Sequence, residues 1–398
     1  MNNDKGAASM LPRERVSLAL SHEESDRIPW GEVLIDYNIF EDVLGRKSFA
    51  NSHFYEQKAI WEGKRDEVVA HYNRDIPELT DALELDIVTL PASPFPERGE
   101  IVAPLTQISE NEYRNEVGDI LRVSGSCWLL PFKRNRDAYV EPTVESLEEE
   151  IEQVKALPPE DIASSKWEVH RHIVEKMKPT HFMTTLAGGI EFPKFGCDEE
   201  DRWINMIEKP EVCRKVAELR GVRSIREIQT FAALGVDAVI PCADLGNSMN
   251  LDASPETYRD MVKPWHQKQV DEAHRLGIHI LLHCCGHILP IVSEVADLFD
   301  AYQAIQKTAG MDIGSLKPMV GDTTTLWGGI LHEHLNGGTP SEIREDARYS
   351  LSRAAAGGGF ILGSTHSLSV GAKIENVWEM KKCRDEWGNY PIKPDTWN

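Results

Sequence analysis

The chain is short of positive charge, of long apolar runs and of cysteines spaced for disulfides. Its 398 residues carry 43 Lys plus Arg against 65 Asp plus Glu, a formal net charge of −22. Nucleic acid is therefore not an expected partner, because binding to phosphates requires a concentrated basic surface. No run of about 18 apolar residues is present, so no membrane span is expected. The charged segment Met1–Leu20 does not resemble a signal peptide.

The seven cysteines favour reduced thiols over a disulfide framework. Two of them, Cys284 and Cys285, are adjacent in sequence, and an odd number cannot pair completely. Reduced thiols and the lack of a targeting segment predict a cytoplasmic protein.

Short apolar segments alternate with helical stretches along most of the chain, which favours one α/β unit. Each predicted strand is bounded by Gly, Pro or polar residues, as strands covered on both faces should be. The eight are Arg27–Ile35, Asp86–Leu90, His181–Leu186, Asp237–Cys242, His279–Cys284, Ala301–Ile305, Thr325–Ile330 and Phe360–Gly363. Eight strands with helical crossovers predict a (β/α)₈ TIM barrel, here a single domain over residues 1–398.

The chain is longer than a minimal barrel of about 250 residues. We assign the surplus to an N-terminal helical extension, residues 1–26, and to an insertion between the second and third strands, approximately residues 92–160. Polar and apolar residues alternate over Glu112–Val123, which predicts a β-hairpin. Helices are predicted over Ser146–Val154, over Pro210–Leu234, from Ser254 to Leu276, and after the capping box that begins at Thr339.

Potential metal ligands follow the fifth and eighth strands. Side chains alternate along an extended strand, so His283 and Cys285 should point the same way, as half of a tetrahedral zinc site. Barrel strand ends converge on one mouth, which would bring His366 to the same place, with Glu32 as a further ligand or a support. A buried Cys is often a small core residue, and Glu32 could equally be paired within the barrel, so spacing alone leaves both interpretations open.

Other polar residues lie at the same mouth. Asp244 follows the fourth strand, where it could act as a general acid or base or could simply begin a turn. Gln303, at the end of the sixth strand, is expected to orient substrate. The pair Gly188-Gly189 permits close approach of the backbone, either to a ligand or to a neighbouring loop. No dinucleotide or phosphate-binding loop motif is present.

Taken in order along the chain, several motifs resemble the uroporphyrinogen decarboxylase superfamily, from about Leu11 to Glu386. They are Arg13-Glu14-Arg15-Val16, Asp26-Arg27-Ile28-Pro29-Trp30, Gly235-Val236-Asp237-Ala238, His283-x-Cys285-Gly286, Trp327-Gly328-Gly329 and Gly358-Gly359-Phe360-Ile361-Leu362. The superfamily contains decarboxylases of a tetrapyrrole and corrinoid-dependent methyltransferases. The resemblance implies a barrel fold and one of these two activities.

The resemblance favours the methyltransferase branch. True decarboxylases carry an Arg-Gln-Ala-Gly-Arg segment after the first strand to hold carboxylates, whereas Gly31–Tyr37 contains no arginine. The zinc site of the methyltransferases uses a His-x-Cys pair, matched by His283 and Cys285. Where the coenzyme M enzymes have a late Cys, this chain has His366. Neutral imidazole in place of thiolate leaves more positive charge on zinc, which suits an oxygen leaving group better than thiol activation.

We therefore predict an O-demethylase that moves a methyl group from a small methoxylated donor, with an aromatic ether as one candidate, to the cobalamin of a separate corrinoid protein. The predicted ligands of zinc are His283, Cys285 and His366; the predicted catalytic residues are Asp244, Gln303 and Glu32; and the predicted substrate-binding residues are Tyr37, Gly189, Asn247 and Trp327. The alternatives are a metal-free decarboxylase or lyase using His366, a methylcorrinoid:thiol methyltransferase, and a non-catalytic binding barrel. Barrels of this size commonly associate, so the chain could also form a homo-oligomer.

Overall fold

A parallel sheet forms the centre of the molecule. The structure is a computed structural model that describes residues 10–397, so the first nine residues of the predicted N-terminal extension lie outside it. Within the described chain, seven parallel strands occur in the order β1-β6-β7-β8-β9-β10-β11. They are β1 (Ile87–Leu90), β6 (Phe182–Ala187), β7 (Ala238–Pro241), β8 (His279–His283), β9 (Ala301–Gln303), β10 (Thr325–Ile330) and β11 (Phe360–Ser364). The predicted α/β barrel class is confirmed.

Residues 27–35, predicted as the first strand, join the two edges of this sheet without forming a regular strand. The carbonyl of Pro29 accepts a hydrogen bond from the Leu362 amide at 2.9 Å, on the β11 side. On the other side, the Asp86 amide, just before β1, donates to the carbonyl of Trp30 at 2.8 Å. Pro29 has no N–H to continue a ladder, so the pairing is limited to isolated bridges. The segment still occupies the eighth position of the barrel.

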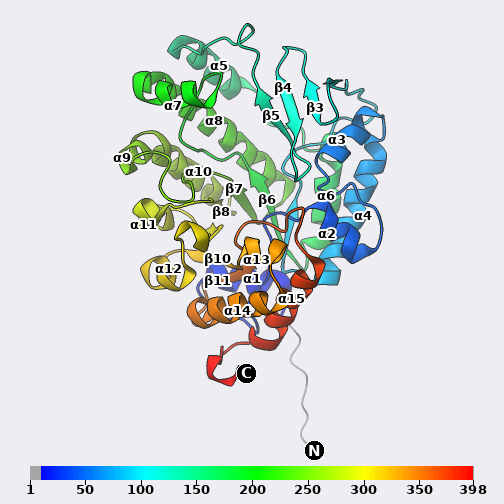
Figure 1. Ribbon diagram of the computed structural model, residues 1–398, viewed down its shortest axis with the longest axis vertical. Coiled ribbons are helices and arrows are strands. Elements are labelled where there is room, and N and C mark those ends of the chain that lie inside the picture. Colours follow the sequence, from blue (N-terminus) through cyan, green and yellow to red (C-terminus); the bar gives the residue numbers. More distant parts are fainter. Residues whose placement is uncertain (1–9, 398) are drawn as a thin grey trace, which may run out of the picture.

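Helices surround the sheet and α1 lies across the N-terminal ends of its strands (Figure 1). The helices are α1 (Pro12–Leu20), α2 (Tyr37–Leu44), α3 (Phe54–Trp61), α4 (Arg65–Leu83), α5 (Val144–Ala156), α6 (Glu168–Met177), α7 (Glu199–Glu208), α8 (Pro210–Leu234), α9 (Pro255–Thr257), α10 (Lys263–Arg275), α11 (Val292–Ala296), α12 (Ile313–Val320), α13 (His332–Gly337), α14 (Pro340–Ser350) and α15 (Ile374–Trp387). None of the helices in residues 10–397 has both the length and the apolar character needed to cross a membrane.

Two apolar layers hold the barrel together. One fills the barrel interior, where Val16 and Leu20 of α1 pack against residues near the strand starts, such as Phe182 and Ala301. The larger layer lies between the sheet and the surrounding helices. Because α1 covers the N-terminal ends, a site inside this barrel opens at the C-terminal ends of the strands.

The predicted insertion contains the predicted hairpin within a larger antiparallel sheet. The strands β2 (Thr106–Gln107), β3 (Glu112–Arg114), β4 (Ile120–Val123) and β5 (Leu129–Lys133) pair in sequence order. The β3–β4 turn has Gly118 at φ +92°, a conformation that favours glycine. Figure 1 places β3, β4 and β5 beside α3, and the amide of Phe54 in α3 donates to the carbonyl of Cys127 in the β4–β5 turn. The insertion therefore contacts the rest of the molecule at α3, which follows segment 27–35 in the chain.

Candidate metal centre

The three predicted metal ligands lie together at the C-terminal ends of β8 and β11. Ligand atoms of His283, Cys285 and His366 all lie within 4.8 Å of one another. The Cys285 Sγ is 3.4 Å from His283 Nε2, and the two imidazole rings meet edge to face with centroids 5.6 Å apart. Two imidazoles and a thiol match the nitrogen and sulfur ligands of tetrahedral zinc. No fourth His, Cys, Asp or Glu of residues 10–397 joins the group, an arrangement typical of catalytic zinc with one open position.

Gln303, at the end of β9, fixes the tautomer of His283. Both hydrogens of its amide group donate to carbonyls, to Ser364 at 3.3 Å and to His366 at 2.9 Å. Its Oε1 must then be the atom that faces His283 Nδ1, which therefore carries the proton. The lone pair of His283 is left on Nε2, the atom next to Cys285 Sγ. Metal-bound histidines are commonly oriented in this way by a hydrogen bond to the other ring nitrogen.

Burial keeps the candidate ligands neutral. It lowers the pKa of His283, and together with the neighbouring His283 and His332 it lowers the pKa of His366 to about 4. Burial and then the Asp244 carboxylate raise the pKa of the Cys285 thiol. The imidazoles are consequently free bases that can donate a lone pair, while the thiol has to release its proton when a cation binds.

The two carboxylates predicted at this mouth have different surroundings. Asp244 is exposed in the loop after β7, and its Oδ1 accepts a hydrogen bond from the Cys285 amide at 2.9 Å. Glu32 is buried, and its oxygens accept from Trp30 Nε1 and from the amide and hydroxyl of Ser364. Burial raises the pKa of Glu32 to about 7. Glu32 therefore supports the β11 end, whereas Asp244 is the carboxylate open to solvent.

Gln303 was predicted to orient substrate, whereas its amide group makes hydrogen bonds to protein atoms. The side chain is fully buried, with both N–H groups directed at backbone carbonyls and the oxygen at His283. It has no donor left for a substrate. The geometry makes Gln303 a residue that positions a metal ligand.

Two of the predicted substrate-binding residues have contacts that explain them without a ligand. Gly189 lies against the neighbouring β7 loop, where a Cβ would be 1.5 Å from the carbonyl oxygen of Cys242. Trp327 is fully buried in the barrel interior and donates from Nε1 to the carbonyl of Gly31 at 3.0 Å. A substrate-binding role for either residue has no support in these contacts.

Of the other two predicted substrate-binding residues, Asn247 lies in the loop after β7 and Tyr37 at the start of α2. The side-chain oxygen of Asn247 accepts from the amides of Met249 and Asn250, so the residue organises its own turn. Tyr37 begins α2, and its hydroxyl is 3.7 Å from Cys127 Sγ in the β4–β5 turn. Tyr37 thus contacts the insertion, and its role toward a substrate stays a prediction.

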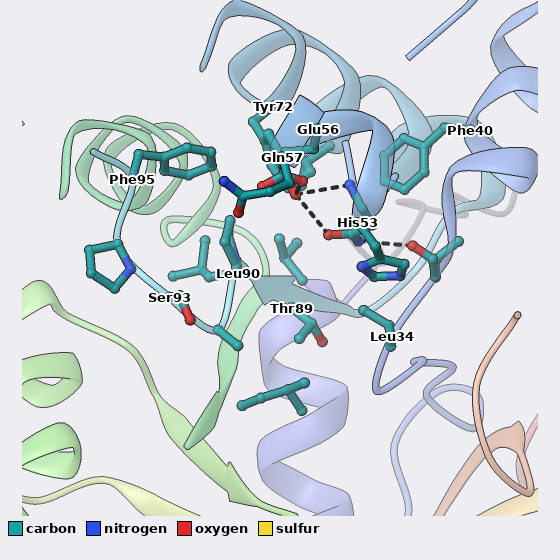
Figure 2. Close-up of a pocket in the computed structure, with 18 of the residues that line it drawn as sticks. Leu34, Phe40, His53, Glu56, Gln57, Tyr72, Thr89, Leu90, Ser93 and Phe95 are labelled. Atoms are coloured by element: carbon teal, nitrogen blue, oxygen red, sulfur yellow. Dashed lines mark hydrogen bonds between the residues drawn. The ribbon is translucent and has the colours of Figure 1, made fainter. Parts of the chain in front are cut away.

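A cavity of about 720 Å³ adjoins this region and contains polar residues that sequence reasoning missed (Figure 2). It is bounded by residues 32–35, by β1, by α3 and α4, and by Trp128 and Leu129 of the insertion. His53, Glu56 and Tyr72 are among the polar residues that line it. They belong to helices and turns before β1 with no motif of their own, so the sequence offered no signal for them. Glu32 lines the cavity and also contacts Ser364, two residues before His366.

Comparisons with known proteins found a matching family model and solved structures to which this chain is similar. Residues 198–387 match the family model described as uroporphyrinogen decarboxylase (URO-D). Among solved structures, a methyltransferase from Methanosarcina mazei is similar with a TM-score of 0.64 and 19% identity, covering 95% of this chain and 99% of the other. A B12-independent methionine synthase from Shewanella sp. W3-18-1, in complex with selenomethionine, is similar with a TM-score of 0.40 and 10% identity, covering 81% and 89%.

No curated protein sequence matches the chain. The family match covers the strands from β7 to β11 and therefore includes all three candidate ligands. The sequence resemblance is confirmed, because residues 198–387 match the model of the uroporphyrinogen decarboxylase family.

Proposed function

We propose that the protein is a zinc-dependent methyltransferase that moves a methyl group from a small methoxylated donor to the cobalamin of a separate corrinoid protein. The observation that carries the proposal is the group formed by His283, Cys285 and His366, with His283 held in the metal-binding tautomer by Gln303. The likeness of the whole chain to a methyltransferase structure agrees with it.

The chemistry of the donor set favours an oxygen leaving group. With two neutral imidazoles and one thiolate, a bound zinc ion would act as a Lewis acid on the ether oxygen. In the proposed reaction the methyl–oxygen bond breaks, a carbon–cobalt bond forms on cob(I)alamin, and the leaving oxygen acquires a proton. Asp244 is the exposed carboxyl group beside Cys285, so we assign it the relay of that proton from water.

Decarboxylation of a tetrapyrrole fits the site poorly. Its substrate carries several carboxylates, which require cationic partners when they are taken out of water. The cavity beside residues 32–35 is lined by Glu32, Glu56 and Glu100, and its described lining contains no Lys or Arg. A polyanion would meet carboxyl groups there and no Lys or Arg of the described residues.

Zinc analysis and methyl transfer test the proposal together. Protein purified without chelators should contain about one zinc per chain, and His283→Ala, Cys285→Ala and His366→Ala should each lose it along with methyl transfer. Transfer is measured from the absorption change of reduced cobalamin mixed with methoxylated donors. Cys284→Ala is the matched control, because its side chain is fully buried beside the site and is absent from the ligand group.

Two outcomes would contradict the proposal. Normal zinc content in all three ligand variants would show that the metal, if any, binds elsewhere. Unchanged activity after chelation, in protein that contains no stoichiometric zinc, would instead favour a metal-free reaction.

A further inference from the structure

The cavity beside the metal centre has walls suited to an aromatic ring. Phe40, Tyr72, Phe95 and Trp128 line it together with aliphatic residues from β1 and α4. Figure 2 shows Phe40 and Phe95 on opposite sides of the space, with Leu90 between them on β1. Its volume of about 720 Å³ lies in the range of small-molecule sites and exceeds what one substituted benzene ring requires.

The polar end of the cavity is a carboxyl group held in place by a tyrosine. Tyr72 donates its hydroxyl to Glu56 Oε2 at 2.6 Å and accepts a hydrogen bond from the Asn51 amide at 2.9 Å. Tyr72 is buried, so its donor and acceptor are both directed at the protein. Within residues 10–397, Tyr72 is the one recorded hydrogen-bond partner of the Glu56 carboxyl group. Oε1 of Glu56 is thus available to a ligand.

Two residues at this end of the cavity have strained backbone conformations. Asn51 and His53 both line the cavity and have φ values of +52° and +50°, which are costly for residues other than glycine. Asn51 Nδ2 donates to the carbonyl of Ile35, and His53 Nε2 is 2.8 Å from Asp36 Oδ1. These contacts fix the turn before α3 against the end of segment 27–35. Strain kept at a cavity wall is typical of ligand sites.

Hydrogen bonds connect one wall of the cavity to the metal centre. Glu32 lines the cavity, and its carboxyl group accepts the hydroxyl of Ser364 at 2.6 Å. The carbonyl of Ser364 accepts from Gln303, the residue that orients His283. Glu32 thus connects the cavity wall, through Ser364 and Gln303, to the candidate ligand His283.

We propose that this cavity binds the methyl donor and that Glu56, positioned by Tyr72, accepts a hydrogen bond from a hydroxyl group on a neutral aromatic ether. The inference rests on the proposed function and makes it more specific. The donor class is a methoxyphenol. A methoxybenzoate of the same size is excluded, because its carboxylate would meet Glu32 and Glu56 in a cavity without a described cationic residue.

Calorimetric binding to the full chain tests this without cobalamin. The probes are ortho-methoxyphenol, methoxybenzene, which lacks the hydroxyl, and ortho-methoxybenzoate. At pH 8.5, where Glu56 is ionised, we expect methoxyphenol to bind about tenfold more tightly than methoxybenzene, as a hydrogen bond to a charged acceptor provides, and methoxybenzoate to bind more weakly than both. Glu56→Leu should abolish the preference for methoxyphenol. Glu67→Leu, an exposed Glu on α4 outside the cavity, is the matched control and should retain it.

A second variant guards against misfolding of the first. Tyr72→Phe keeps the ring and removes the hydroxyl that holds Glu56, so it should reduce the preference for methoxyphenol without closing the cavity. Three results would overturn the inference. Methoxyphenol and methoxybenzoate could bind equally, both variants could keep the full preference for methoxyphenol over methoxybenzene, or no probe could bind at all.

The same ligands separate this inference from the proposed function. Methoxyphenol binding that depends on Glu56, without methyl transfer to reduced cobalamin, would support the cavity assignment and contradict the methyltransferase proposal. Methyl transfer that is indifferent to Glu56→Leu would support the proposed function and overturn the inference.

Discussion

At the residue scale, the metal centre depends on a side chain that cannot itself bind zinc. Gln303 is fully buried, and three hydrogen bonds fix its orientation. Replacing it with Leu should leave His283 free to change tautomer and ring orientation. We expect Gln303→Leu to weaken zinc binding about tenfold to a hundredfold, in line with the loss of comparable supporting residues. Competition with a chromophoric chelator measures this. Zinc affinity equal to wild type would show that His283 is oriented by other contacts.

Glu56 predicts a pH dependence of stability. Burial raises the pKa of its carboxyl group from 4.5 to about 7, with the Tyr72 hydrogen bond acting in the opposite direction. Because the folded-state pKa exceeds the unfolded one, this contribution to stability is complete below about pH 4.5 and is lost as pH rises through 7. Between pH 5 and pH 8 the wild type should lose on the order of 2 kcal/mol relative to Glu56→Gln, allowing for water in the cavity. Urea unfolding at both pH values measures this difference. An equal change in the free energy of unfolding between pH 5 and pH 8 for wild type and Glu56→Gln would contradict the prediction.

The sequence could predict the three candidate metal ligands, but their interactions depend on contacts between distant segments. His283 and Cys285 follow from strand alternation, and His366 from the convergence of strand ends. The role of Gln303 depends on the carbonyls of two residues about 60 positions away. Glu56 lies in a helix whose residues give no indication that a cavity will form beside it.

At the element scale, residues that typically begin or end a helix made most element boundaries predictable. The helix predicted over Pro210–Leu234 is α8 with the same bounds, and Gly235 follows in the left-handed conformation. The capping box at Thr339 begins α14. The predicted strand Ala301–Ile305 is shorter in the structure and ends at Gln303, because Ala304 has φ +74°. Such a conformation in a non-glycine residue is imposed by the surrounding fold and has no local sequence signal.

Ring stacking attaches the inserted sheet to the barrel. Trp128, just before β5, stacks on His53 with ring centroids 3.5 Å apart and an interplanar angle of 22°. The imidazole of His53 is held in turn by Asp36. We expect Trp128→Ala to weaken the attachment by about 1 kcal/mol and to leave the barrel folded.

Hydrogen–deuterium exchange resolves this local effect. Amide exchange should accelerate in residues 106–133 of the variant and stay unchanged in β7, β8 and β11. Phe132→Ala is a suitable comparison, since Phe132 is an exposed residue of β5 that stacks with Arg122 of the same sheet. Equal exchange in Trp128→Ala and wild type would show that the stacking contributes nothing to the attachment.

At the scale of the whole molecule, alternating strands and helices predicted the barrel, whereas its closure depends on one buried charge. Asp86 is fully buried at the start of β1. Its carboxylate accepts from Arg15 of α1 at 3.1 Å, from Arg27 at 2.7 Å and from the Trp30 amide at 2.8 Å. One side chain thus joins α1, segment 27–35 and the central sheet. No pattern in the sequence marks this network, because its members lie up to 71 positions apart.

Removing that carboxylate should destabilise the entire fold. Asp86→Ala would remove the carboxylate that Arg27 and the Trp30 amide share, while Arg15 keeps its pair with Asp26. Breaking such a buried pair costs about 3–5 kcal/mol. Asp86→Asn keeps one acceptor oxygen and should lose less. Glu62→Ala, which removes an exposed pair with Lys64, should leave the stability nearly unchanged, because water screens that pair. The midpoint of urea unfolding orders the three variants, and an Asp86→Ala midpoint equal to that of Glu62→Ala would show that the barrel closes without this carboxylate.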